Sequence, residues 1–213
     1  MDALDANFEG PRGEEILKMC LAVPKFGNDI DEVDMLARRV SEMSASSITS
    51  YDNGDGNMRF KSLREGLSWH YAAGKGVGAM PNGHKALEPL YDGSASPMHG
   101  MDKNGPTAVL RSVLKANFGD HSYVQVLNQK FPKSMFKSDA DIEKLVDLTN
   151  SFLGAGGTHI QYNLVDNKEL KAAREKPEEH KDLLVRVGGF SAYFVQLSPQ
   201  IQEDIYLRSE QHL

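Results

Sequence analysis

The sequence predicts an α/β protein, because stretches with helical spacing of apolar residues alternate along the chain with short strand-like runs. The alternation is clearest in the second half, which reads helix, strand, helix, strand, helix, hairpin, helix. The 213 residues include 40% hydrophobic residues, enough to bury one sizeable core. The chain could therefore be a single domain or part of a larger one.

Two helices are predicted near the N-terminus. The first covers residues 14–22 and is stopped by Pro24, which has no amide hydrogen for an interior helical position. The second covers residues 29–44, and its charged side is expected to be solvated or to face a subunit. Its other face carries the apolar residues Ile30, Val33, Leu36, Ala37 and Val40.

A long irregular stretch follows. Residues 46–57 are rich in Ser, Asn, Asp and Gly and predict a loop, and residues 69–108 have few periodic apolar positions. So long a loop in a compact protein usually serves a function or a partner surface. His70, His84 and His99 lie here without the spacing of metal ligands, so we expect structural or surface roles and no bound metal.

The second half begins with a helix over residues 107–115 after Pro106, then a strand over 123–131. Ser138 opens the next helix in a capping pattern with Asp141, and residues 154–157 end it. The residues expected to face the core from this helix are Ile142, Leu145, Val146, Thr149, Phe152 and Leu153.

A strand over 159–165 comes next, with Asp166 as the expected cap of a helix that runs to about Lys176. Two apolar runs around a glycine pair then predict a hairpin over residues 183–195. Ser198 and Pro199 open a final helix, whose apolar residues are Ile201, Ile205 and Leu207.

Composition excludes several classes of function. A net charge of -6 leaves no basic face for nucleic acid, and no apolar run is long enough to cross a bilayer. The first residues lack the basic and apolar regions of a signal peptide, which predicts a cytoplasmic protein. The one cysteine, Cys20, cannot form an internal disulfide and is expected to pack within the first helix.

The glycine pair lies in the run Arg186, Val187, Gly188, Gly189, Phe190. A plain hairpin is the simplest interpretation, since glycine permits tight turns. A glycine Cα that loses a hydrogen can also flatten without strain and store an unpaired electron. The run resembles the radical-bearing loop of the glycyl radical enzymes, in which Arg-Val is followed by a small residue, Gly, and Tyr or Phe.

This resemblance places the radical on Gly189. The family more often has Ser or Ala where this chain has Gly188, so Gly188 is a second candidate hydrogen donor, although the register favours Gly189. Residues 78–108 and the run from His159 to Val165 resemble two further blocks of the family. The departures within the first of these blocks are Asn82 for Asp, His84 for Arg and Leu87 for Gly.

The resemblance implies a specific fold: the C-terminal portion of a ten-stranded α/β barrel, completed by a partner chain or a missing N-terminal segment. Residues 1–135 would form a helical and loop-rich segment of the barrel, and residues 136–213 the glycyl radical domain. Arg186 is expected to anchor the loop to a carboxylate or a carbonyl, because a guanidinium does not deprotonate. A dry seat for the radical is expected from Leu184, Val185, Val187, Phe190 and Phe194.

The resemblance also implies an anaerobic radical mechanism. An activating enzyme with an iron–sulfur cluster and S-adenosylmethionine would remove one hydrogen from Gly189. The radical would pass to a cysteine thiol, which would then take hydrogen from a small organic substrate. The family's cysteine sits on a loop tip, unlike Cys20, so it would belong to a larger subunit or an N-terminal segment.

Three hypotheses about function stay open at this point. In the first, the chain is a radical-bearing C-terminal subunit or fragment of a lyase. Its motifs resemble the lyase, decarboxylase and hydrocarbon-fumarate-adding branches more than pyruvate formate-lyase. Alternatively it is a repair module resembling the autonomous glycyl radical cofactor. A third hypothesis is a structural subunit that carries no radical.

Overall fold

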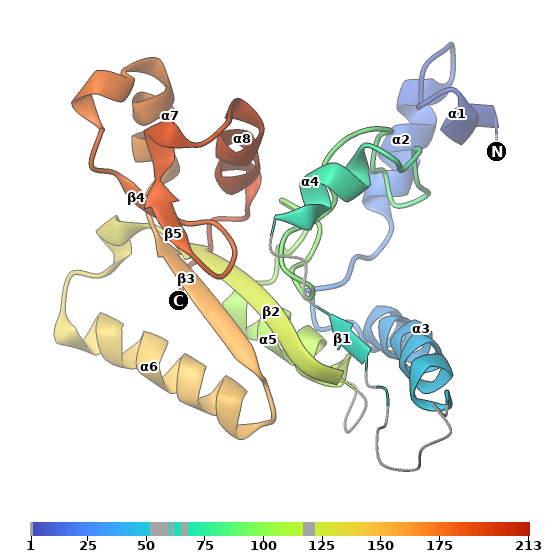
Figure 1. Cartoon of the computed structure of the whole chain (residues 1–213), viewed down its shortest axis with the longest axis horizontal. Helices are drawn as coiled ribbons and strands as arrows, with labels where there is room; N and C mark the ends of the chain where they lie inside the picture. The colour runs from blue at the N-terminus through green and yellow to red at the C-terminus, as the bar shows by residue number, and fades with distance from the viewer. Residues whose placement is uncertain (1, 52–59, 61, 65–67, 117–121) are drawn as a thin grey trace.

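The computed structural model describes residues 2–51, 60, 62–64, 68–116 and 122–213, with only the backbone for 62–64 and 122–125. From residue 106 onward its helices and strands follow the predicted alternation (Figure 1), whereas the helix Trp69–Gly74 lies in the stretch predicted to be irregular. In chain order they are α1 (Asp2–Asp5), α2 (Gly13–Ala22), α3 (Asp31–Thr49), β1 (Ser62–Arg64), α4 (Trp69–Gly74), α5 (Pro106–Lys115), β2 (Ser122–Phe131), α6 (Asp139–Gly154), β3 (His159–Leu164), α7 (Asn167–Glu175), β4 (Leu184–Arg186), β5 (Ser191–Tyr193) and α8 (Pro199–Leu207). Short 3-10 turns at Lys133–Met135, Pro177–Glu179 and Phe194–Gln196 connect some of them.

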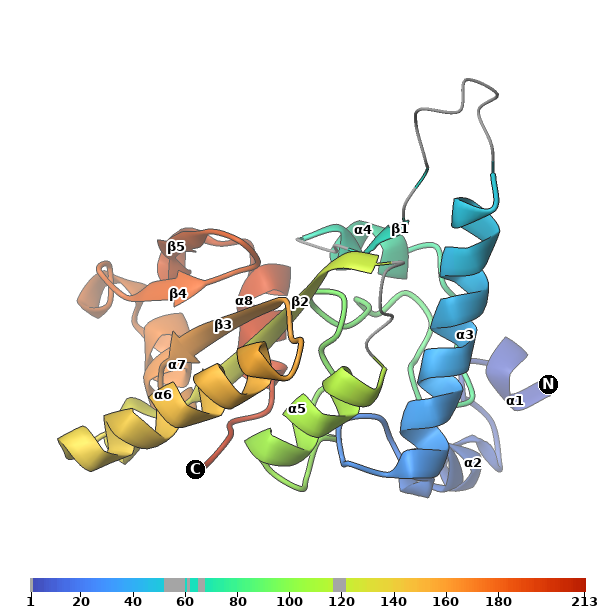
Figure 2. The same ribbon diagram turned by 90° about the horizontal axis from the view of Figure 1, so that it is seen from below.

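A parallel sheet in the order β1-β2-β3 runs through the middle of the chain. The helix α6 connects β2 to β3, as parallel neighbours require. Figure 2 shows α5 and α6 together on one side of this sheet. On that side Leu127 packs with Val109, Val113 and Phe152, all almost fully buried, which fixes the two helices against the strands.

The opposite face of β2 and β3 is polar although it is buried. Asn128 pairs in register with Gln161, and Lys130 pairs with Asn163. Each of these four side chains is at most 8% exposed. Buried polar groups need hydrogen-bond partners. Here other parts of the chain supply them: the β4–β5 hairpin, the helices α7 and α8, and Asp92.

The C-terminal elements have a core of their own. The hairpin and the helices α7 and α8 enclose a cluster of buried apolar side chains, made of Val165, Leu170, Ala173, Leu183, Val185, Val187, Phe194 and Ile205. This cluster and the polar face of β3 hold the hairpin from two sides.

The structure corrects the prediction for the second helix, which runs to Thr49 rather than ending before the expected loop at residue 46. Its buried residues are Asp34, Ser41 and Ala45, whereas Leu36 and Val40 are each 61% exposed. The reason is a pair of polar contacts to α5: the Asp34 carboxylate accepts from the Ser112 hydroxyl at 3.0 Å and pairs with Lys115 at 3.3 Å, which turns the polar face inward. The remainder of the predicted loop, residues 52–57, lies outside the described residues.

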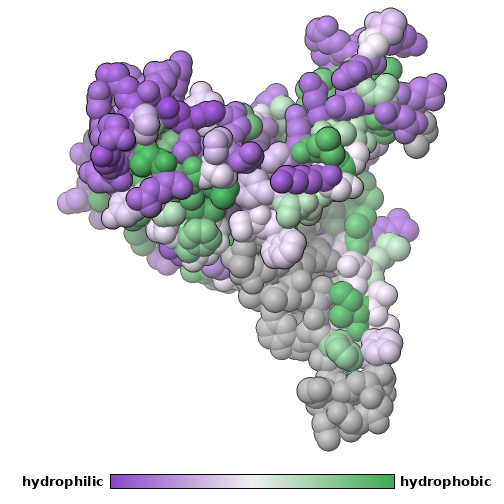
Figure 3. Space-filling view, turned by 45° about the horizontal axis from the view of Figure 1, so that its top comes forward, coloured by the Kyte–Doolittle hydropathy of each residue, from purple (hydrophilic) through white to green (hydrophobic). Residues whose placement is uncertain are grey.

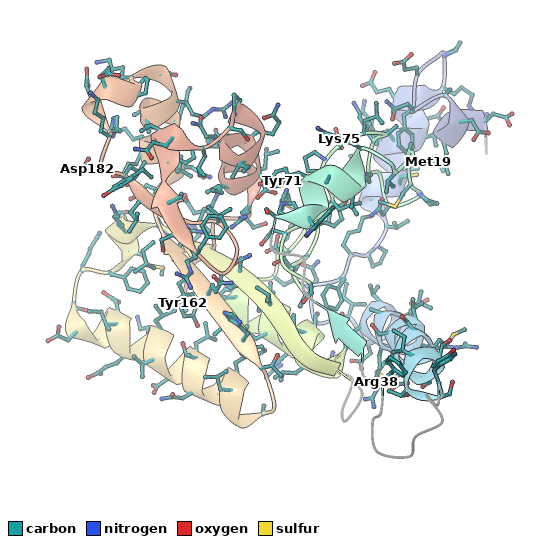
Figure 4. All side chains as sticks on the ribbon, viewed as in Figure 1. Met19, Arg38, Tyr71, Lys75, Tyr162 and Asp182 are labelled. Carbon is teal, nitrogen blue, oxygen red and sulfur yellow. The ribbon has the colours of Figure 1, made fainter. Side chains whose placement is uncertain are left out.

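The helix α6 differs from its prediction in the same way. Its first turn forms the predicted capping box of Ser138 and Asp141, and Phe152 is buried as expected. Ile142, Val146 and Leu153 are instead 45–51% exposed. Tyr162, labelled in Figure 4, meets the inner side of α6 through its hydroxyl, 2.7 Å from the Thr149 hydroxyl. The apolar stripe of α6 is therefore only partly covered.

Asp166 lies at the predicted N-cap position of α7, but its side chain makes no capping hydrogen bond. Its carboxylate accepts from the Ser134 hydroxyl at 2.7 Å instead. The first amide of α7, at Asn167, donates to the Glu210 carboxylate at 2.9 Å. Glu210, close to the C-terminus, thus accepts from an amide at the start of α7 that Asp166 was expected to satisfy.

Candidate functional site

The site is built on the β4–β5 hairpin. Antiparallel pairing joins Leu184 to Tyr193 and Arg186 to Ser191, and the Val187 amide donates to the Phe190 carbonyl at 2.9 Å. This leaves Gly188 and Gly189 as the two turn residues. Gly189 has a φ of +85°, a conformation that glycine adopts without a steric penalty. Gly188 is buried, whereas Gly189 is exposed at the tip.

Two amide side chains of β3 bind the backbone of the hairpin. The Gln161 oxygen accepts from the Gly189 amide at 2.9 Å and from Arg186 Nε at 2.7 Å. Asn163 makes a matched pair of bonds to Arg186, accepting from its amide at 2.6 Å and donating to its carbonyl at 2.7 Å. Gln161 and Asn163 reach the same strand because residues two apart share one face of β3.

Arg186 was expected to anchor the loop to a carboxylate or a carbonyl. Its guanidinium binds the side-chain carbonyl oxygen of Gln161 and, through Nη1, the Ser191 hydroxyl at 3.2 Å. Arg186 thus bridges β3 to both strands of the hairpin.

Arg208, just after α8, binds the hairpin from the other side. Its Nη2 donates to the Val187 carbonyl at 2.9 Å and its Nη1 to the Arg186 carbonyl at 3.3 Å. The same guanidinium pairs with Asp204 at 2.7 Å and lies 3.7 Å from Asp92. Arg208 is 5% exposed, so these contacts replace the water that a guanidinium needs.

His70 and His99, which are far apart in the sequence, meet at Asp204. His70 Nε2 lies 3.3 Å from Asp204 Oδ1, and His99 Nε2 lies 3.5 Å from the same oxygen and 3.3 Å from Asp92. The sequence predicted structural or surface roles for these histidines, and it gave no sign that they share one carboxylate.

The charges in this cluster shift the neighbouring groups in consistent directions. Burial alone would raise the pKa of Asp92 and of Asp204, but Arg208 and the histidines outweigh it, and both pKa values lie below the usual range. Burial and then the Asp204 carboxylate raise the pKa of Tyr71, which Figure 4 labels on α4. The cluster therefore keeps two carboxylates ionised behind the hairpin.

The predicted dry seat is only half correct. Val185, Val187 and Phe194 are buried, but Leu184 is 58% and Phe190 is 48% exposed. Successive residues of a strand point to opposite sides, so one side of the hairpin faces the C-terminal core and the other faces outward. The described residues leave that outer side, with Gly189, uncovered.

Cys20 does not lie near the hairpin. It lies on α2, which both Figure 1 and Figure 2 show at the opposite end of the molecule from β4 and β5. An open cleft of about 740 Å³ lies between the segment around His84 and the helix α8, but Gly189 does not line it. The predicted site residues thus lie together on the hairpin and not in this cleft.

Sequence reasoning missed Gln161, Asn163, Arg208 and Asp204 as parts of the site. A signal existed for the first two, because amides at alternate positions of an otherwise buried strand need specific partners. No local pattern pointed to Arg208 or Asp204, which look like ordinary charged positions of a terminal helix.

Comparison with known proteins agrees with this arrangement. Residues 91–195 match the family model described as Glycine radical, and residues 1–64 match the one described as Pyruvate formate lyase-like. The isethionate sulfite-lyase of Bilophila wadsworthia is 37% identical over 98% of this chain and 25% of its own length. The indoleacetate decarboxylase of Tractidigestivibacter scatoligenes is 37% identical over 92% of this chain and 22% of its own.

Solved structures show the same relationship. The B12-independent glycerol dehydratase from Clostridium butyricum superposes with a TM-score of 0.89 at 38% identity, covering 100% of this chain and 26% of the dehydratase. The chain spans about a quarter of the length of the relatives it matches, and its mixed α/β structure corresponds to their C-terminal portion. The two family models and the superposition on the dehydratase show that the chain belongs to the glycyl radical enzymes and corresponds to their C-terminal portion.

Proposed function

We propose that this chain is the radical-bearing C-terminal part of a glycyl radical lyase, with Gly189 as the residue that holds the radical. One observation supports this choice of residue above the others. Gly189 lies at the tip of a hairpin whose backbone Gln161, Asn163 and Arg208 hold in place, within the region that matches the Glycine radical model.

The residues at the hairpin fit such a group. Gly189 has no side chain to oppose flattening of its Cα, its amide is held by Gln161, and its outer side is open to an approaching enzyme or covering segment. Gly188, by contrast, is buried beneath the turn. When present, the radical would take a hydrogen atom from a cysteine thiol elsewhere in the complete enzyme, which would move the unpaired electron to that sulfur.

The chain's own residues have supporting roles in this proposal. The backbone carbonyls of Arg186 and Val187 accept hydrogen bonds from Asn163 and Arg208, respectively. The buried side of the hairpin excludes water from one of its faces. Phe190, half exposed beside Gly189, would complete a dry seat only against another segment. That segment is the cysteine-bearing remainder of the enzyme.

The partners and substrate class follow from the family. An iron–sulfur activating enzyme that uses S-adenosylmethionine would reach Gly189 from its exposed side. The relatives include a sulfite-lyase, a decarboxylase and a dehydratase, so we propose radical cleavage of a carbon–sulfur, carbon–carbon or carbon–oxygen bond in a small organic substrate.

Three further expectations belong to this proposal. The division into a barrel segment over residues 1–135 and a glycyl radical domain over 136–213 is one, and an anaerobic, cytoplasmic setting is another. The third is an absence of bound metal in this part of the enzyme. None of the helices that the structure describes is both long and apolar enough to cross a membrane.

The decisive test is electron paramagnetic resonance of the complete enzyme after anaerobic activation. We expect a doublet, because the unpaired electron couples to the one hydrogen left on Gly189. Gly189→Ala should abolish the signal, whereas the neighbouring control Gly188→Ala should retain it if the chain still folds by circular dichroism.

The outcomes separate the hypotheses. A doublet that survives Gly189→Ala but not Gly188→Ala would move the radical to Gly188. A folded, correctly assembled wild-type enzyme with no signal after activation would favour the structural subunit and overturn the proposal.

A further inference from the structure

Gln161 stands out among the buried polar side chains near the hairpin. It is 5% exposed, and its oxygen accepts from two donors, the Gly189 amide and Arg186 Nε. Because both neighbours can only donate, the side-chain oxygen must face them and the nitrogen must point away. That nitrogen has no hydrogen-bond partner among the described residues. The orientation of Gln161 is therefore set by the hairpin.

We infer that Gln161 is a positioning residue for the radical: it fixes the peptide plane between Gly188 and Gly189, so that spin on the Gly189 Cα can spread onto a held amide. This inference rests on the function proposed above and adds a residue that the hairpin motif does not contain. Among the described residues, the bond from the Gly189 amide is the one hydrogen bond that joins β3 to the turn residues.

The geometry of Gly189 explains why the amide needs to be held. At a φ of +85°, the bond from Cα to the carbonyl carbon stands nearly perpendicular to the amide plane. A flattened Cα shares its unpaired electron with the amide nitrogen only when that bond lies close to the plane, so the backbone must rotate about φ. Rotation about φ leaves the N–H direction unchanged, because the preceding peptide plane alone determines it.

Gln161 can therefore keep its bond while the far side of Gly189 turns. On the far side the Phe190 side chain is 48% exposed, and the rotation has to strain the bond from the Val187 amide to the Phe190 carbonyl. The near side is fixed, because Arg186 Nε holds the Gln161 oxygen and Asn163 holds the Arg186 backbone. A hydrogen bond from a charged donor is stronger than a neutral one, so Arg186 stiffens the acceptor that the glycine amide uses.

A purely structural role for Gln161 predicts something different. In that case its loss would lower stability but would leave the radical, once formed, with the same spectrum and lifetime. The spectroscopic signature of the radical therefore separates the two roles.

The test compares Gln161→Leu with Gln129→Leu in the complete, anaerobically activated enzyme. Gln129 is a matched control: a glutamine on the neighbouring strand, 3% exposed, with no hydrogen bond to the hairpin in the described structure. We expect Gln161→Leu to lower the spin per chain about threefold to tenfold, the effect of one lost hydrogen bond, and to change the nitrogen coupling seen on labelling with 15N-glycine. Gln129→Leu should leave both unchanged.

If the Gln161→Leu variant unfolds at the temperature used for activation, Gln161→Asn replaces it. The shorter amide side chain keeps the polarity but moves the oxygen away from Gly189. Equal spin yield and equal nitrogen coupling in the folded Gln161 variant and the Gln129 control would overturn the inference while the wild-type doublet still supported the proposed function. Absence of the doublet in the wild-type enzyme would overturn both.

Discussion

At the residue scale, Arg208 joins the glycyl hairpin to the rest of the chain. Its guanidinium contacts two hairpin carbonyls and the carboxylates of Asp204 and Asp92. The carboxylates hold the pKa of Arg208 above its usual value although burial opposes them. The residue is therefore a fixed charge at the centre of a buried network.

Arg208→Gln should be strongly destabilising, because it leaves two buried carboxylates without their cation. The expected loss in the free energy of unfolding is about 3 to 5 kcal/mol, measured by urea denaturation. Arg38→Gln is the control: Arg38 pairs with Glu42 on the surface of α3, and its loss should cost at most about 0.5 kcal/mol. Similar losses for the two variants would contradict the role given to Arg208.

Lys130 is the second residue with a testable charge. It is 1% exposed and donates to Asn167 at 2.7 Å and to the Tyr206 and Ile205 carbonyls at 2.8 and 3.2 Å. Cations suit the C-terminal end of a helix such as α8. Burial nevertheless lowers the pKa of Lys130 from 10.5 to about 8, with Glu210 partly opposing the shift.

This lowered pKa predicts how stability changes with pH. Between about pH 8 and pH 10.5 the unfolded chain holds a proton at Lys130 that the folded chain has released, so the contribution of Lys130 to the free energy of unfolding rises with pH. The full difference corresponds to about 3 kcal/mol. Lys130→Met should remove this rise, as measured by urea denaturation across the interval. An unchanged slope in the variant would exclude Lys130 as its source.

At the element scale, α3 carries its apolar residues on the outside. Leu36 and Val40 are each 61% exposed and Met43 is 67% exposed, and they follow one another at helical spacing. Figure 3 shows apolar (green) residues at the lower right, on the side where α3 lies. An exposed stripe of this kind marks a surface that another segment covers, which agrees with a chain that spans a quarter of its relatives.

Charges on this stripe should weaken assembly but not folding. The double variant Val40→Lys with Met43→Lys should keep the melting temperature of the chain, because neither side chain is buried in it. It should reduce binding to the cysteine-bearing remainder of the enzyme, measured by co-purification. Ala45→Lys, on the fully buried face of α3, should instead lower the melting temperature. Undiminished co-purification of the double variant would show that the remainder does not cover α3.

The hairpin is the second element whose form depends on its neighbours. Its strands have three residues each, and an isolated hairpin of this size is marginal in water. Buried valines on one side and the amides of β3 along its edge keep it in one register. The glycine turn is thus held in place by its neighbours rather than by the pairing of the hairpin strands alone.

At the scale of the whole molecule, the proposed radical site lies at the edge of the surface that this chain covers. The inner side of the hairpin belongs to a complete core, and the outer side, with Gly189, is open. The open side and the exposed stripes of α3 and α6 are the surfaces that we propose the remainder of the enzyme covers. The arrangement agrees with a division in which this chain stores the radical and the remainder of the enzyme supplies the thiol and the substrate pocket.

Much of the fold was predictable from local patterns. The positions of α2, α5, α6, β2, β3 and the hairpin follow from apolar spacing, from Pro106 and from the Ser138 cap, because these signals act within one turn or one strand. The directions in which α3 and α6 face were not predictable. A periodic pattern shows that one side of a helix is apolar, but it does not show which segment covers that side.

The sequence by itself determined the order of the elements, the family motif and the glycine that the motif places at the turn. Only the tertiary structure decided what holds that glycine. Gln161 and Asn163 of β3, Asp92 and Arg208 come from three separate segments, and their side chains meet because the parallel pairing of β2 with β3 presents a buried polar face. Buried polar groups select specific partners since each unpaired one costs free energy, and those partners can be identified only once the chain has folded.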